Sequence, residues 1–293
     1  MDPEVLKQLA KGAVPVGIAM TVVLALLWRG TSTDKPVTRW RVMVALLAAA
    51  AGYLLTHHFV FDEITLSPMQ AFETIPLVVA AGAVMLAVGV MIPGASLATA
   101  IATGLAGAAV SMLVISKRKP WAEEPWLELG VFAALSVLSV LSIGWYSSRR
   151  PAAVSGILMF GFAAGSSQLL VLSMSSLKQG QVAGVPAAIA TAVIVASVLM
   201  RRAPLMSLWS LMVLIVMVAL EQGWRYGGGS GAAPLRSVLL ASAVLPLAAL
   251  AHAFLPGKLI GVKRYALEIG VAALPMLVAL GLAGYEFAKQ QSE

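Results

Sequence analysis

Long apolar runs separated by short polar connectors make up nearly the whole chain. Each run is about as long as the roughly 20 helical residues that cross the hydrocarbon core of a bilayer. Alternation with a period of two residues is absent, and the runs are too long for the strands of a membrane barrel. The pattern predicts an all-α integral membrane protein with about ten transmembrane helices, at residues 12–28, 40–60, 74–92, 95–116, 126–146, 151–174, 181–200, 205–222, 235–256 and 265–287.

Tryptophan and tyrosine residues support most of these boundaries. They gather near the ends of the proposed spans, where an amphipathic ring fits the membrane interface: Trp28, Trp40, Trp126, Trp145, Tyr146, Trp209, Trp224, Tyr265 and Tyr285. The division between the third and fourth spans is the least defined, because only Pro93 and Gly94 separate them. These two runs form either a hairpin or one re-entrant element.

The composition places the whole chain, residues 1–293, in a single polytopic membrane domain. Hydrophobic residues make up 60% and charged residues 11%, against about 25% charged in an ordinary soluble domain. The net charge of +7 comes from basic residues gathered at span ends, which is typical of headgroup contact rather than nucleic-acid binding. The absence of cysteine excludes disulfides and thiolate metal sites, and we expect no cofactor.

Charge also gives a prediction of orientation. Loops on one side of a ten-span chain hold 11 of the 20 Lys and Arg residues, which is close to an even split. The connector around Asp62, Glu63 and Glu73 has no Lys or Arg, and we expect it, with both termini, outside the cytoplasm. Asp2 and Glu4 do not fit a cleavable signal, so the first span is expected to stay in a bacterial-type inner (plasma) membrane protein.

Two short internal sequence similarities suggest that the chain has two related halves. The segment LELGVFA at 127–133 resembles LEIGVAA at 267–273, an offset of 140 residues, and GIAM at 17–20 resembles GILM at 156–159, an offset of 139. The offsets relate span one to span six and span five to span ten. Because five is odd, halves at 12–146 and 151–287 would be inverted repeats; the alternative is chance likeness between Ala- and Leu-rich helices.

This layout favours one function over two others. Inverted halves are a common construction of secondary transporters, and in length, span number and layout the chain is similar to the drug/metabolite transporter superfamily. No motif of that superfamily matches residue by residue, so the resemblance implies no substrate. We therefore predict a secondary transporter or permease for a small or lipid-like solute. A non-catalytic membrane subunit or scaffold, with membrane protein partners, is the main alternative.

An intramembrane enzyme acting on lipid is the third reading, and His57, His58 and Glu63 are its nearest set of polar residues. The chain has no phosphate-binding glycine loop, HExxH motif or GxSxG elbow. We expect no enzyme. We also expect no metal or haem, because His57 and His58 lie near the interface rather than deep in facing helices.

Polar residues inside spans are the candidates for solute or ion binding, since their burial in lipid is costly: Gln168, His252, Glu128, Glu268 and Glu221. Glu128 and Glu268 are the repeat-related pair, and each sits near a helix start, where a carboxylate also stabilises the helix dipole. Glu221 precedes a glycine-rich segment that is either a gate or a solvated loop.

Prolines inside the spans predict kinks, because each removes a backbone hydrogen bond: Pro15, Pro76, Pro186, Pro246 and Pro275.

Overall fold

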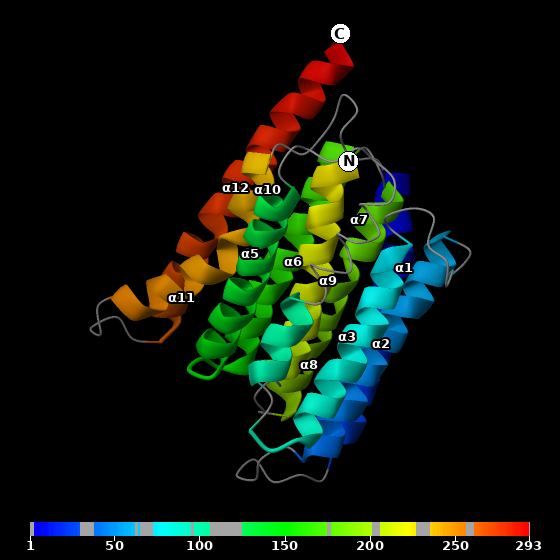
Figure 1. Ribbon diagram of the computed structural model, residues 1–293, viewed down its shortest axis with the longest axis vertical. Coiled ribbons are helices and arrows are strands. Elements are labelled where there is room, and N and C mark those ends of the chain that lie inside the picture. The colour runs from blue at the N-terminus through cyan, green and yellow to red at the C-terminus, as the bar shows by residue number, and fades with distance from the viewer. Residues whose placement is uncertain are drawn as a thin grey trace.

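The helices of this protein form one bundle in the computed structural model (Figure 1). The residues described are 3–29, 38–61, 64, 73–94, 97–105, 125–174, 177–200, 206–226, 235–255 and 261–292, and within them all regular structure is α-helical. The helices are α1 (Pro3–Trp28), α2 (Arg39–Phe61), α3 (Thr74–Met91), α5 (Pro125–Ser147), α6 (Ala152–Met174), α7 (Leu177–Ala183), α8 (Val185–Met200), α9 (Met206–Tyr226), α10 (Leu235–Ser242), α11 (Val244–Phe254) and α12 (Val262–Ser292). Residues 97–105 form a further helix.

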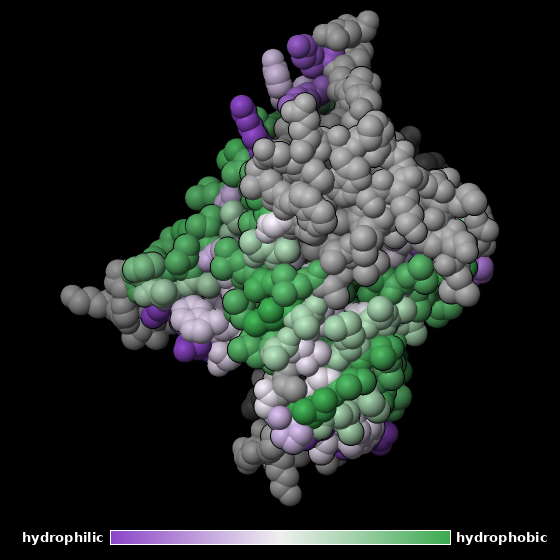
Figure 2. All heavy atoms as spheres, in the orientation of Figure 1, coloured by the Kyte–Doolittle hydropathy of each residue, from purple (hydrophilic) through white to green (hydrophobic). Residues whose placement is uncertain are grey.

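Six helices are long and apolar enough to cross a bilayer, and the bent pair α10–α11 makes a seventh if it is one span. The six lie at Arg39–Phe61, Thr74–Met91, Gly130–Ser147, Ala152–Leu172, Gly180–Leu199 and Val262–Lys289. The prediction of an all-α, multi-pass membrane protein is confirmed at this level. Apolar side chains cover much of the face on view in Figure 2, as lipid contact requires.

Helix α9 lies at the centre of the bundle. Every residue from Ser207 to Gly223 is buried, and α9 packs against α2, α3, α5 and α6. A helix that is apolar on all sides belongs in the interior rather than at a boundary. The outer helices surround it and turn apolar side chains outward, such as Phe59 on α2, which is 77% exposed.

Two of the predicted proline kinks appear as helix breaks. Helix α7 gives way to α8 at Gly184, two residues before Pro186, and α10 gives way to α11 at Ala243, three residues before Pro246. The second break bends the chain by 44°. Each proline lacks an N–H and its ring crowds the carbonyl four residues earlier, so the helix is interrupted just before it. Pro15 and Pro275, by contrast, lie inside the continuous helices α1 and α12.

The segment around Pro93 and Gly94 is a turn between two helices that pack together. Gly94 has φ +75°, a left-handed conformation that favours glycine. Gly89 of α3 approaches the helix at 97–105 so closely that a Cβ there would lie 2.2 Å from Thr99 Oγ1. The described part of this region is therefore a hairpin.

The contacts between helices differ between the two halves of the chain. Helix α12 packs against α6, whereas the described residues of α5 and α1, their counterparts in the proposed repeat, are not in contact. Likewise α1 packs against α8, but α6 and α2 do not meet within the described residues. This packing gives no support to inverted repeats.

Candidate functional site

A buried carboxylate joins the ends of three helices at one end of the bundle. Glu268, in the second turn of α12, is fully buried. Tyr146 reaches it from the end of α5, Arg150 from the turn between α5 and α6, His252 from the end of α11 and Arg264 from the first turn of α12. We call these five residues the Glu268 cluster.

Both oxygens of Glu268 are engaged. Oε2 accepts hydrogen bonds from the Tyr146 hydroxyl at 3.0 Å and from Arg150 Nε at 2.9 Å. Oε1 is paired with Arg150 Nη2, with Arg264 Nε at 3.1 Å and with His252 Nδ1 at 3.1 Å. Arg150 therefore holds the carboxylate with two nitrogens, the strongest geometry available to an arginine.

The two arginines of the cluster are charged and stabilise the ends of the helices. Arg264 Nη2 donates to the backbone carbonyl of His252 at 3.0 Å, where a cation stabilises the negative end of α11. Burial lowers the pKa of Arg150, but the hydrogen bond and the charge of Glu268 outweigh it and raise that pKa overall. Arg150 thus stays charged, and the cluster fixes the ends of α5, α11 and α12 to one another.

A second polar contact lies inside the bundle at the C-terminal end of α9, away from the Glu268 cluster. Gln222 Nε2 donates to the Thr74 hydroxyl of α3 at 2.8 Å, and both side chains are buried. The neighbouring Glu221 is 1% exposed. The hydrogen bond between Gln222 and Thr74 joins the end of α9 to the start of α3. Glu221 belongs to the packed interior, because its side chain is buried.

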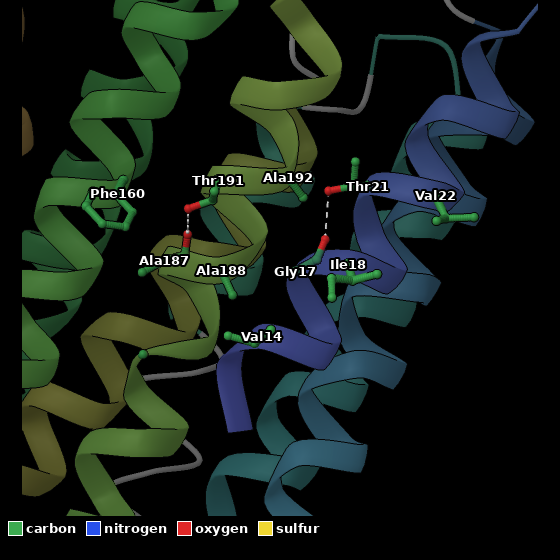
Figure 3. Close-up of a pocket in the computed structure, with 11 residues that line it drawn as sticks. Val14, Gly17, Ile18, Thr21, Val22, Phe160, Ala187, Ala188, Thr191 and Ala192 are labelled. Atoms are coloured by element: carbon green, nitrogen blue, oxygen red, sulfur yellow. Dashed lines mark hydrogen bonds between the residues drawn. The ribbon is translucent and has the colours of Figure 1, made fainter. Parts of the chain in front are cut away.

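A groove with a volume of about 500 Å³ lies along α1 and α8, and Phe160 of α6 lines it from the side of α8 away from α1 (Figure 3). Its lining is apolar apart from two threonines: Val14, Gly17, Ile18, Thr21, Val22, Phe160, Gly184, Ala187, Ala188, Thr191 and Ala192. The Thr21 hydroxyl donates to the Gly17 carbonyl at 2.8 Å, and that of Thr191 donates to the Ala187 carbonyl at 2.9 Å. No lining residue is charged.

A smaller groove of about 230 Å³ lies between α6 and α12. Its lining is wholly apolar: Ile157, Leu158, Gly161, Phe162, Gly165, Val244, Ile269, Ala273, Met276, Leu277 and Leu280. Ile157 is 45% and Leu277 is 61% exposed, so the groove opens toward lipid.

The structure brings together two of the five residues expected to bind solute or ion. His252 and Glu268 are hydrogen-bonded in the Glu268 cluster. Gln168 is partly buried in α6 and lines neither groove, and Glu221 is buried near the end of α9. The side chain of Glu128 lies outside the described residues, although its backbone belongs to α5.

The histidines form no metal centre in the described part of the chain. His57 is 1% exposed and its ring packs between those of Tyr53 and Phe61. No group of three potential metal-ligating His, Cys, Asp or Glu residues occurs among the described residues. Glu63, the third member of the polar set considered for a lipid-modifying enzyme, lies outside the described residues.

Sequence reasoning missed the partners of Glu268 and both grooves. The spacing of Arg264 and Glu268, four residues apart on one helix, was a signal for an ion pair. Arg150 is one of the basic residues at span ends, and nothing local in the sequence links it to a residue 118 positions away. Thr21 and Thr191 gave no signal, because single hydroxyls in apolar helices are common packing residues.

Comparisons of the chain with known protein families, curated proteins and solved structures gave no match.

Proposed function

We propose that this protein is a transporter or permease for an electrically neutral, lipid-like solute, and that the groove between α1 and α8 is its binding site. The observation that carries this proposal is the depth of the groove. Thr21 and Gly17 lie seven and eleven residues before the end of α1 at Trp28, or about 10–17 Å along the helix. In a hydrocarbon core about 30 Å thick, this is the middle of the membrane, where transporters bind their solutes.

The lining of the groove supports a solute of this chemical class. Its volume of about 500 Å³ falls within the range of about 300–1,000 Å³ that holds small molecules. The absence of charge among its lining residues favours an apolar body over an ion or a hydrophilic metabolite. The hydroxyls of Thr21 and Thr191, on facing helices, supply the few polar contacts that orient a ligand.

The break between α7 and α8 supports movement at this groove. Gly184 forms the break and also lines the groove. Its N–H donates to both the Gly180 and Gln181 carbonyls, at 2.9 and 3.2 Å, and this shared hydrogen bond marks the interruption of the helix. A broken helix beside a binding site is a construction that transporters use to change access. A shift of α8 at Gly184 would widen or close the groove.

The proposal includes ten spans. The six long helices and the α10–α11 pair supply seven, and the predicted spans at 12–28, 205–222 and 95–116, of which the first two correspond to α1 and α9, are the other three. The predicted halves at 12–146 and 151–287 would then have opposite orientations. Superposing the backbone of residues 12–146 on that of residues 151–287 in an experimental structure tests the inverted repeat separately from transport.

Transport is tested by filling the groove. The protein is reconstituted into liposomes with fluorescent analogues of phosphatidylcholine, ceramide and diacylglycerol, and their movement between leaflets is followed by chemical quenching. Wild type should accelerate at least one probe over empty liposomes. Thr191→Phe should slow that probe by about tenfold, the effect of roughly 1.4 kcal/mol of lost binding.

Val198→Phe is the matched control, because Val198 lies on α8, is 64% exposed and does not line the groove. It should transport as wild type does. If the pure wild-type protein accelerates none of the three probes, the transport proposal fails and the alternative of a non-catalytic subunit is favoured. Equal loss in both variants would place the binding site elsewhere.

A further inference from the structure

We infer that the groove between α6 and α12 binds an anionic phospholipid of the surrounding bilayer, with one acyl chain in the groove and the phosphate beside the arginines of the Glu268 cluster. This inference concerns a different groove from the one proposed for transport, and neither depends on the other.

The groove begins at the Glu268 cluster. Tyr265, Ile269, Ala273, Met276 and Leu280 follow one another at intervals of three or four residues, so they lie on one face of α12. The last four of them line the groove. Tyr265 therefore stands at its mouth, one turn before Ile269.

Arg150 places a positive charge at that mouth. Its guanidinium carbon lies 5.0 Å from the centre of the Tyr265 ring. Two of its nitrogens hold Glu268, and its Nη1 makes no hydrogen bond to the described residues. A guanidinium with a remaining donor, beside a tyrosine at the membrane interface, suits a phosphate oxygen.

The charges around the mouth favour an anion. Arg150 and Arg264 carry two positive charges against the one carboxylate of Glu268, and Arg149, next to Arg150 in the chain, adds a third. Arg149 is exposed, with its guanidinium 4.4 Å from the centre of the Trp145 ring. The α1/α8 groove has no such charges, so an anionic lipid is expected at α6/α12 and not there.

The length of the groove fits one acyl chain in one leaflet. From Ile269 to Leu280 the helix rises by about 16 Å, which is about half of a hydrocarbon core roughly 30 Å thick. Ile157 and Leu277 are exposed along its side, so a chain can enter laterally from the bilayer. The glycines at 161 and 165 leave the α6 wall without side chains, and space remains above Gly161, where a Cβ would meet nothing within 4 Å.

The test is lipid binding by the purified full-length protein in detergent, measured by native mass spectrometry. The probes are dioleoyl phosphatidylglycerol and dioleoyl phosphatidylcholine, which share acyl chains and differ in charge. We expect phosphatidylglycerol to bind about tenfold more tightly. Glycerol 3-phosphate at the same concentration should not displace it, because the free headgroup lacks the chain that occupies the groove.

Two variants address the two parts of the site. Gly161→Leu fills the groove, and Arg149→Gln removes a charge while leaving the pairs of Glu268 intact. Each should weaken phosphatidylglycerol binding by about fivefold or more. Gly281→Leu and Arg236→Gln are the controls. Gly281 is exposed on α12 with open space at its Cβ, and Arg236 is exposed on α10.

Equal binding of the two phospholipids would overturn the inference, as would variants that bind phosphatidylglycerol as their controls do. Displacement by glycerol 3-phosphate would also overturn it, because the site would then recognise a soluble phosphate. A variant that fails to fold is detected by its elution in size exclusion, and Gly161→Ala then replaces Gly161→Leu with the same expected direction.

Discussion

At the scale of single residues, Glu268 illustrates how a charge is tolerated next to lipid. Its carboxylate has no contact with solvent, yet two arginines, a tyrosine and a histidine surround it. Such a group stabilises the fold only as a complete set, because removing one member leaves the others buried and uncompensated. The cluster therefore holds the ends of α5, α11 and α12 together.

The stabilising role of the Glu268 cluster can be tested with Glu268→Gln. The substitution removes the negative charge and leaves Arg150 and Arg264, whose side chains are only 11% and 18% exposed, close to each other without a counterion. We expect a loss of about 3–5 kcal/mol in the free energy of unfolding, the usual effect of breaking a buried pair. Unfolding in mixed micelles with increasing denaturing detergent measures it.

Glu286→Gln is the matched control on the same helix, since Glu286 is only partly buried. It should change stability by about 0.5 kcal/mol at most. Equal stability of Glu268→Gln and wild type would show that the arginines find other partners and that the cluster does not hold the helix ends.

The residue scale also shows where sequence reasoning stopped. Glu268 was identified because an ionisable residue in an apolar run is unusual, and this reasoning needs only local sequence. The proposed structural role, stabilising the start of its helix, needs no partner, whereas the structure shows four side chains around the carboxylate. Three of them, Tyr146, Arg150 and His252, come from other helices or turns, which tertiary packing alone brings to Glu268.

At the scale of helices, the boundaries were predictable but the buried faces were not. Apolar length fixes where a helix crosses the membrane, and the predicted span at 151–174 matches Ala152–Met174 closely. The side of a helix that meets lipid is as apolar as the side that meets protein, so no amphipathic stripe marks it. Leu211 is fully buried while Leu250 is 51% exposed, although both lie in uniformly apolar runs.

Close approach of helices at glycine gives a prediction at this scale. Gly156 of α6 faces α8, and a Cβ there would lie 2.5 Å from Cγ1 of Ile194 and 3.6 Å from the Ala190 carbonyl oxygen. Gly156→Leu should therefore separate α6 from α8 and cost about 1–3 kcal/mol, the usual effect of overpacking. The same detergent titration measures the change.

The control for this substitution is Gly130→Leu on α5. Gly130 is exposed, and a Cβ there meets nothing within 4 Å. It should leave stability near that of wild type, because it adds a side chain only at an open surface. If Gly156→Leu is as stable as Gly130→Leu, the two helices have room to adjust and the close contact is not required.

At the scale of the whole molecule, charge is distributed unevenly between the two ends of the bundle. The end that carries the Glu268 cluster has seven basic residues in the described chain: Arg29, Arg39, Arg41, Arg149, Arg150, Lys263 and Arg264. The opposite end has six in the described chain: Lys7, Lys11, Lys178, Arg225, Arg236 and Lys289. Glu268 is the only carboxylate among the described residues at that end. The other described acidic residues, such as Glu73 and Glu286, belong to the opposite end, where α1 begins and α12 finishes (Figure 1).

Lys and Arg are therefore nearly balanced between the two ends, and the prediction of orientation rests on the connector around Asp62, Glu63 and Glu73, which has no Lys or Arg. Basic residues close to span ends are retained on the cytoplasmic side, so the end with the Glu268 cluster should face the cytoplasm and both termini should lie outside it.

The chain contains no cysteine, so single cysteines can be placed without background. Ser148→Cys, in the exposed turn after α5, and Ala288→Cys, exposed near the end of α12, report the two ends. In intact cells a membrane-impermeant maleimide should label Ala288→Cys and not Ser148→Cys, and permeabilised cells should show both labelled. The reverse pattern would contradict the orientation, and partial labelling of both positions would show that the chain inserts in two senses, as an even balance of Lys and Arg between the two sides permits.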